Sequence, residues 1–334
     1  MVKLSILDQA PISSGQSAAE ALQVSVKLAQ LGESLGYERF WMAEHHDLFG
    51  LACPNPAVML AHIGTETETI RIGAGAVLLP YYKPFRVAET YNLLATLFPG
   101  RIDLGLGRAP GGSAEVSLAL VDNYLQEVGR YSQSIDELKA FLHDKVPEDS
   151  MFANIKPTPL PDIPAELWLL GTSERSALLA ADKGMAYAFG HFMSDFSGPD
   201  LVQTYREQFT EKDGQKPSVI IAVHVICAPT TEEAYQIAKS TRAWGLLQAK
   251  QHEDLRIPSL EEVDAYAWTA EERRKLESED RRLVIGNPEE VARELNELAN
   301  LYEADELMLV TITHDPEAKF TSYKLVAEAM AESK

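Results

Sequence analysis

The sequence predicts an α/β protein folded as a (β/α)8 TIM barrel. Short apolar runs alternate with longer segments of helical period along the 334 residues, which is typical of βα units around a parallel sheet. About eight such units occupy the whole length, and this number favours a closed barrel over an open doubly wound sheet. Two of the strands end in glycine-rich backbone, where barrel enzymes keep their sites. We therefore expect residues 1–334 to form one barrel domain.

The predicted strands are short, apolar and bounded by turn residues. They cover residues 3–8, 39–43, 70–78, 102–106, 166–170, 185–189, 219–227 and 306–311.

The predicted helices between them carry apolar residues three and four positions apart. They cover residues 17–35, 56–66, 85–98, 132–143, 173–183, 200–209, 231–247 and 288–302. Several begin with capping signals, such as Ser173 with Ser176 three residues later and Asn287 before Pro288.

Two segments exceed a minimal barrel and are expected to be insertions. Residues 146–164, before the fifth strand, are rich in proline, and residues 249–283, before the eighth strand, are polar and densely charged. The second is either a mobile lid near the catalytic end or a solvated helical excursion, and the sequence leaves both open.

Composition excludes several classes of protein. Hydrophobic residues make up 46% and charged residues 24%, but no apolar run reaches the roughly 18 residues needed to span a bilayer, so we expect no membrane partner. A formal charge of −20 argues against nucleic acid. Residues 1–11 do not resemble a secretory leader, which makes the cytoplasm the expected location. The distant Cys53 and Cys227 support neither a disulfide framework nor a cysteine zinc site.

Ionisable residues follow the second strand, where Glu44, His45, His46 and Asp47 stand together. A metal site is disfavoured, because adjacent histidines on an extended chain point to opposite sides. We therefore expect no metal, and expect at most one histidine of the pair to face the barrel mouth as acid, base or hydrogen-bond donor.

Glycines mark the third and fourth strands. Gly75 and Ala76 interrupt an apolar strand, which indicates either a flat ligand lying against the main chain or a bulge in the strand. The run from Gly105 to Gly112 imitates a dinucleotide fingerprint, but Pro110 occupies the third glycine position and the motif follows the fourth strand. What remains is exposed backbone at Gly107.

Three further features suit a ligand at the same strand ends. Arg108 can grip a phosphate with two hydrogen bonds, or else forms a surface ion pair. Residues 171–176 place Thr172, Ser173 and Ser176 at the start of a helix, where an anion or a simple helix cap would account for them. His191 follows the sixth strand between aromatic residues.

Together, these motifs resemble the luciferase-like flavin monooxygenase family, of which bacterial luciferase is the namesake. The resemblance rests on the order of residues 41–46, 72–80, 84–89, 99–101, Gly107-Arg108 and 171–176.

The resemblance implies a TIM barrel that takes reduced FMN as a co-substrate from a separate NAD(P)H-flavin reductase. It implies reaction with O2 to a flavin hydroperoxide, insertion of one oxygen atom into a small organic substrate, and a homodimer. By the same resemblance His45 is the family's key histidine. Arg108, Thr172, Ser173 and Ser176 would hold the FMN phosphate, and Gly75-Ala76 would support the isoalloxazine through a cis peptide bond.

This sequence also departs from bacterial luciferase. Gly107 stands where luciferase has a cysteine beside the flavin, residues 110–114 lack the acid of the luciferase loop, and His191 replaces a tryptophan. Light emission from an aldehyde is therefore not expected, although His191 remains a candidate catalytic residue. The competing classes are a deazaflavin-dependent oxidoreductase on the same barrel, a metal-dependent barrel hydrolase, and a flavin-binding protein without turnover.

Overall fold

The computed structural model describes residues 2–195, 197–212, 214–250, 256–277 and 282–332. Within them, eight parallel strands form a closed barrel: β1 (Lys3–Asp8), β2 (Arg39–Met42), β3 (Arg71–Leu78), β4 (Ile102–Gly107), β5 (Glu166–Gly171), β6 (Ala186–Gly190), β7 (Val219–Cys227) and β9 (Glu306–Val310). The TIM barrel predicted from the sequence is confirmed.

The ring closes through pairings between segments far apart in the chain. β1 pairs with β2 on one side and with β9 on the other, where Lys3 lies opposite Glu306. β7 then joins β9 to β6, with Tyr187 opposite Val219. All strands run the same way, so their carboxyl ends meet at one rim.

A ninth strand was missed. β8 (Leu283–Gly286) pairs in parallel with the end of β7, where His224 lies opposite Leu283. The sequence analysis predicted no strand here and placed residue 283 at the end of the insertion. Four apolar residues are too few to show a period, and only the partner strand makes them β structure.

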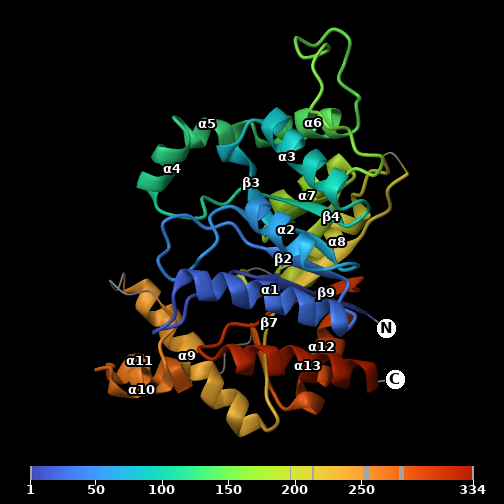
Figure 1. Cartoon of the computed structure of the whole chain (residues 1–334). Coiled ribbons are helices and arrows are strands. Elements are labelled where there is room, and N and C mark those ends of the chain that lie inside the picture. The colour runs from blue at the N-terminus through green and yellow to red at the C-terminus, as the bar shows by residue number, and fades with distance from the viewer. Residues whose placement is uncertain (1, 196, 213, 251–255, 278–281, 333–334) are drawn as a thin grey trace.

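Eight helices close to the predicted ranges cover the outside of the barrel (Figure 1): α1 (Ala18–Ser34), α2 (Pro56–Thr65), α3 (Pro84–Leu97), α6 (Tyr131–Leu142), α7 (Glu174–Lys183), α8 (Gly198–Glu207), α9 (Thr231–Ala249) and α12 (Pro288–Leu301). One of these helices follows each of the first seven barrel strands, and α12 also lies between β7 and β9. A further helix after β9, α13 (Pro316–Glu332), was not predicted. It packs against α1, α12 and β7. None of the described helices is long and apolar enough to cross a membrane.

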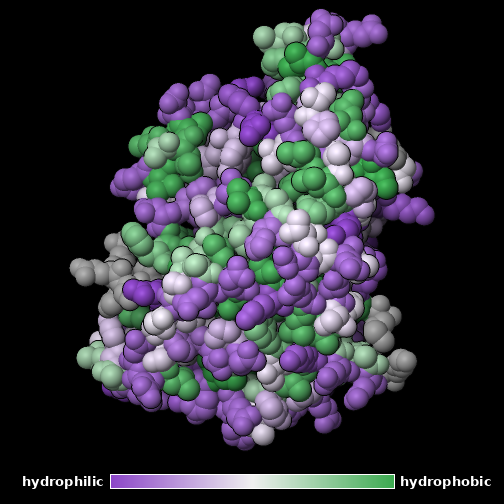
Figure 2. Space-filling model, viewed as in Figure 1, coloured by the Kyte–Doolittle hydropathy of each residue, from purple (hydrophilic) through white to green (hydrophobic). Residues whose placement is uncertain are grey.

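The longer connections contain short helices, namely α4 (Ala114–Leu120) and α5 (Tyr124–Gly129) after β4, and α10 (Leu260–Ala265) and α11 (Ala270–Glu277) after α9. α10 and α11 pack on α9 through a small apolar cluster that includes Leu247, Val263 and Trp268. Residues 251–255 and 278–281 of this insertion lie outside the described residues, so its role as a lid stays a prediction. The proline-rich insertion forms a loop that projects beyond α6 (Figure 1), and it forms a protrusion in the space-filling view from the same side (Figure 2).

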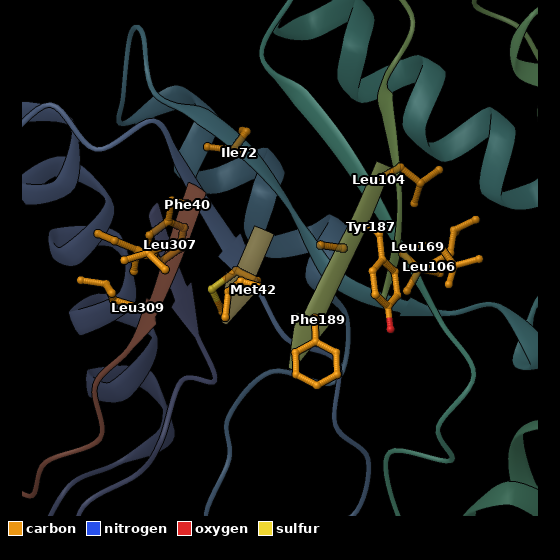
Figure 3. Packing of buried hydrophobic residues seen from close by; sticks show 14 of the residues in the cluster. Phe40, Met42, Ile72, Leu104, Leu106, Leu169, Tyr187, Phe189, Leu307 and Leu309 are labelled. Carbon is orange, nitrogen blue, oxygen red and sulfur yellow. The ribbon is translucent and has the colours of Figure 1, made fainter. Parts of the chain in front are cut away.

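The outer core lies between the strands and the helices. On β2, Phe40 and Met42 belong to this core, and Leu307 and Leu309 on β9 do the same (Figure 3). The residues between them point inward, because side chains alternate along a strand.

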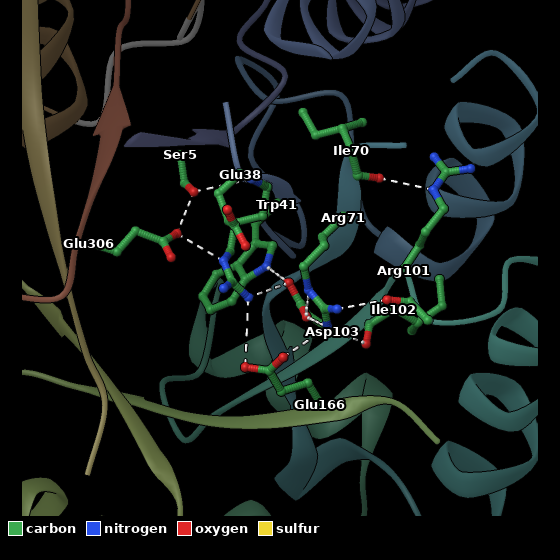
Figure 4. Close-up of polar contacts among 12 residues, drawn as sticks. Ser5, Glu38, Trp41, Ile70, Arg71, Arg101, Ile102, Asp103, Glu166 and Glu306 are labelled. Carbon is green, nitrogen blue, oxygen red and sulfur yellow. Dashed lines mark hydrogen bonds and ion pairs between the residues drawn. The ribbon is translucent and has the colours of Figure 1, made fainter. Parts of the chain in front are cut away.

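The inside of the barrel is layered. At the amino ends of the strands lies a charged cluster of Arg39, Arg71, Asp103, Glu166 and Glu306 (Figure 4). Arg39 is buried and donates to both Asp103 and Glu306 at 2.8 Å.

Above this charged cluster, the rings of Trp41 and Trp168 meet edge to face with centroids 5.7 Å apart. Arg39 lies 4.9 Å from the centre of the Trp168 ring. These two layers fill the lower barrel, which places the cavity at the carboxyl rim.

Candidate active site

A cavity of ≈ 360 Å³ lies at the carboxyl rim of the barrel. Eight of the nine residues assigned to a site from the sequence line it, namely His45, Gly75, Ala76, Gly107, Arg108, Thr172, Ser173 and Ser176. They come from the ends of β2, β3, β4 and β5 and from the start of α7. Parallel strands bring these ends together although the residues are up to 131 positions apart.

Glycines at two inward-facing positions of β3 and β4 let neighbouring groups pack directly against the main chain. A methyl group at Gly75 would lie 2.9 Å from Cε3 of Trp41, and one at Gly105 would lie 2.3 Å from the carbonyl oxygen of Ala74. The indole of Trp41 therefore fills the space below Gly75 and forms part of the cavity wall.

The Gly75-Ala76 peptide bond is cis, as the family resemblance implied. The register of β3 on β4 also shifts between Ala74 and Val77. The strand is therefore irregular at this glycine, and its main chain also borders the cavity, while a flat ligand at this place stays a prediction.

The carboxylate of Glu44 is buried and has several hydrogen-bond partners. Its carboxylate accepts hydrogen bonds from the Tyr82 hydroxyl at 2.7 Å and from the Leu78 amide at 3.2 Å. Nε2 of His46 lies 2.9 Å from the same carboxylate. Glu44 thus ties the end of β2 to the end of β3, and His46 is the histidine of the pair that bonds locally.

His45 is the histidine that lines the cavity. Burial, together with the nearby His46, lowers the pKa of His45 from 6.5 to about 4. Its Nδ1 is buried and has no hydrogen-bond partner among the described residues. At neutral pH His45 is therefore an uncharged imidazole that can offer one N–H or one lone pair to a ligand.

The start of α7 forms a capping box. The Ser173 side chain accepts from the Ser176 amide, and the Ser176 hydroxyl accepts from the Ser173 amide and donates to the Ser173 carbonyl oxygen at 2.6 Å. Helix capping therefore explains both hydroxyls in part. The amides of Glu174 and Arg175 come first in the helix and have no partner within it, so they remain available to an anion.

Two arginines border the cavity beside this helix. Arg108 and Arg175 also line an adjoining vestibule of ≈ 280 Å³ between α5, α6 and α7. Neither guanidinium has a carboxylate partner within the part of the chain that the structure describes. Tyr131 lines both spaces, is only 4% exposed, and its hydroxyl lacks a hydrogen-bond partner among the described residues. Two guanidinium groups and a buried hydroxyl group therefore border the same end of the cavity.

His191 is placed differently from the other candidates. It is not among the residues that line the cavity, and its Nδ1 lies 2.8 Å from the Tyr302 hydroxyl at the end of α12. The neighbours Phe192 and Met193 line the cavity instead. A catalytic part for His191 stays a prediction, and the geometry favours His45.

Sequence reasoning missed Arg175 and Tyr131. Arg175 lies between Ser173 and Ser176 in the motif at the start of α7, so its positive charge could have predicted it as a site residue. Tyr131 begins α6 after two short, unpredicted helices, and nothing in the sequence marks it as part of the site. Among the described residues there is no group of three or more histidine, cysteine or acidic side chains placed to hold a metal ion.

A closed parallel barrel with a cavity at its carboxyl rim, lined by glycines and bordered by two arginines, is typical of a barrel enzyme. Residues 2–303 match the family model described as luciferase-like monooxygenase, and the chain belongs to that family. It is accordingly an oxygen-incorporating enzyme of the flavin type.

Related proteins match over the full length. An N-acetyl-S-alkylcysteine monooxygenase of Bacillus subtilis (strain 168) is 34% identical, and the match covers 100% of both chains. The protein YceB of the same organism is 44% identical over 98% of this chain and 99% of its own. The crystal structure of apo-MsnO8 superposes with a TM-score of 0.90 at 34% identity, covering 99% of each chain.

Proposed function

We propose that this protein is a monooxygenase that uses reduced FMN and O2 to insert one oxygen atom into a small organic substrate. The observation that carries the proposal is a convergence on one cavity. Unpaired Arg108 and Arg175, bare main chain at Gly75 and the neutral imidazole of His45 all border the same space.

The cationic end of the cavity suits the phosphate of a mononucleotide. Arg108 and Arg175 supply charge-assisted hydrogen bonds, and the first amides of α7 point along the positive end of the helix dipole. The Tyr131 hydroxyl adds a neutral donor, because burial raises its pKa well above the ordinary value. This local geometry outweighs the distributed negative charge of the chain, which salt screens.

The glycine-lined wall suits a flat ring. Gly75, Ala76 and Gly107 carry little or no side chain, so a planar system can lie against their backbone. Around it, Leu7, Phe192 and Met308 make the walls apolar. Such walls exclude water from the reacting groups.

When bound, reduced flavin supplies the electrons that activate O2. His45 would donate a hydrogen bond to the bound group from Nδ1 or Nε2, according to its tautomer. Because its pKa is about 4, it is an uncharged imidazole at neutral pH and acts through hydrogen bonds rather than as an acid. Glu44 holds the strand ends that carry His45 and Gly75 in register.

The test is an anaerobic titration with reduced FMN, followed by admission of air and isotopically labelled O2. With a candidate substrate present, we expect stoichiometric binding, one labelled oxygen atom in the product, and less hydrogen peroxide than free reduced flavin releases. Binding of FMN with no labelled product, and with all of the O2 released as peroxide, would identify a flavin-binding protein without turnover. Preference for a reduced deazaflavin over FMN would support the rival oxidoreductase.

His45→Ala separates binding from chemistry. This variant should bind FMN but lose oxygenation of the substrate, and unchanged turnover would contradict the role of His45. Supply of reduced flavin by a separate NAD(P)H-flavin reductase and assembly as a homodimer belong to the same proposal.

The first substrate to test is a small thioether. The 34% identical relative is named for N-acetyl-S-alkylcysteine, and oxygen transfer to sulfur needs no charged partner in the apolar part of the cavity. A labelled sulfoxide or cleavage product in the presence of O2 is the expected readout.

A further inference from the structure

Met193 presents a thioether at the edge of the cavity. It closes the short helical turn His191–Met193 that follows β6, lines the cavity, and is 59% exposed. Its side chain packs over the main chain of Gly190, where a methyl group would lie 3.1 Å from Cγ and 3.3 Å from Sδ of Met193. The sulfur atom therefore lies beside Gly190, which ends β6 and also lines the cavity.

The other sulfur atoms near the cavity are shielded. Met308 also lines it but is only 1% exposed, as is Cys53, whose carbonyl oxygen accepts from the His45 amide. Burial raises the pKa of the Cys53 thiol to about 12, so this thiol is not a reactive thiolate at neutral pH. Met193 is the sulfur that is both near the site and open to small oxidants.

We propose that Met193 is a self-oxidation site, converted to methionine sulfoxide when the enzyme turns over without substrate. The proposal rests on the proposed function. Its oxidant is hydrogen peroxide, the product of reduced flavin and O2 when no substrate accepts oxygen.

The chemistry is a two-electron oxygen transfer. The Sδ lone pair attacks one peroxide oxygen, the O–O bond breaks and an S–O bond forms. Sulfur is oxidised by two electrons, and the second oxygen takes up the protons and leaves as water. The product is a polar, chiral side chain at the mouth of an apolar cavity, and sulfoxide reductases can reverse it. Turnover without substrate would thus make the opening of the cavity more polar.

Met151 provides a built-in control. It lies in the proline-rich insertion, is not among the residues that line the cavity, and is 88% exposed. An oxidant arriving from bulk solvent should reach Met151 at least as readily as Met193. An oxidant released in the cavity should reach Met193 first.

The experiment supplies the enzyme with reduced FMN and O2, without substrate, in the presence of catalase and superoxide dismutase. Peptide mass spectrometry then measures sulfoxide at both methionines. We expect at least a fivefold excess at Met193, and an excess at Met151 when peroxide is instead added to the solution without catalase. Equal oxidation at both sites during turnover, or an unoxidised Met193, would overturn the inference.

A variant with weaker flavin binding tests whether oxidation of Met193 depends on bound flavin. Arg108→Gln should reduce flavin occupancy and abolish the excess at Met193 while bulk peroxide still oxidises both sites. If the unaltered enzyme fails to bind reduced FMN, the proposed function fails. If it binds FMN and releases peroxide but spares Met193, only the oxidation site fails.

Discussion

Trp41 donates its indole N–H to Oδ2 of Asp103 across 2.9 Å. The same ring lines the cavity, and the same carboxylate accepts from Arg39. The wall of the candidate active site is thereby fastened to the charged cluster at the opposite end of the barrel.

Trp41→Phe should lower the free energy of unfolding more than Trp168→Phe, because Trp41 donates an indole hydrogen bond and Trp168 does not. Trp41→Phe leaves an acceptor of buried Asp103 short of one donor, and we expect a loss of about 1–3 kcal/mol in the free energy of unfolding. Trp168→Phe is the matched control, because Nε1 of Trp168 has no partner among the described residues. Urea titration measures both, and equal losses would mean that ring packing alone accounts for the role of Trp41.

The two unpaired arginines should discriminate FMN from riboflavin. Arg108→Gln or Arg175→Gln removes a charge-assisted hydrogen bond of about 1.5–3 kcal/mol, which corresponds to roughly tenfold to hundredfold weaker FMN binding. Riboflavin lacks the phosphate and should bind as before. Arg86→Gln, on the exposed side of α3, serves as a control in calorimetric titrations. A parallel loss of riboflavin affinity would place the phosphate elsewhere.

Because of His45, the free energy of unfolding should decrease as the pH falls. Its folded-state pKa of about 4 lies below the ordinary 6.5, so the unfolded chain takes up the proton first. The stabilisation is therefore complete above pH 6.5 and is lost as the pH falls towards 4. At about 1.4 kcal/mol per pKa unit, the total is about 3 kcal/mol.

His45→Gln should remove this part of the pH dependence, and His62→Gln, at an exposed position on α2, should not. Denaturant unfolding at pH 7, 5.5 and 4 compares the three proteins. Identical acid sensitivity in all three would show that His45 stays solvated.

Gly171 should not tolerate a side chain. A methyl group there would lie 2.2 Å from Oγ and 2.3 Å from Cβ of Ser176, so Gly171→Ala should break the capping box, lower the thermal midpoint and weaken FMN binding. Gly245→Ala in α9 is the control, because nothing lies within 4 Å of the added carbon, the residue does not line the cavity or the vestibule, and alanine favours the helix. Loss of FMN affinity in both variants would argue against the cap as the anion site.

The agreement between sequence and structure is greatest where local signals are strong. The capping boxes at Ser173 and Asn287 occur as predicted, since the side chain and the amide that it caps are three residues apart. The short β8 and the helix α13 were missed. β8 owes its conformation to pairing with β7, and such long-range pairing leaves little trace in four residues.

The sequence alone determined the barrel and the rim on which the candidate site residues lie. The alternation of strands with helices predicts parallel strands, and parallel strands must end together, so Arg108, Ser173 and Gly75 could be assigned to one edge from the sequence. The tertiary structure alone decided which side chains face that space. It directed His45 inward and His191 to Tyr302, added Arg175 and Tyr131, and placed Trp41 beneath Gly75. Side-chain direction depends on the neighbours that pack around each residue, and those neighbours come from distant parts of the chain.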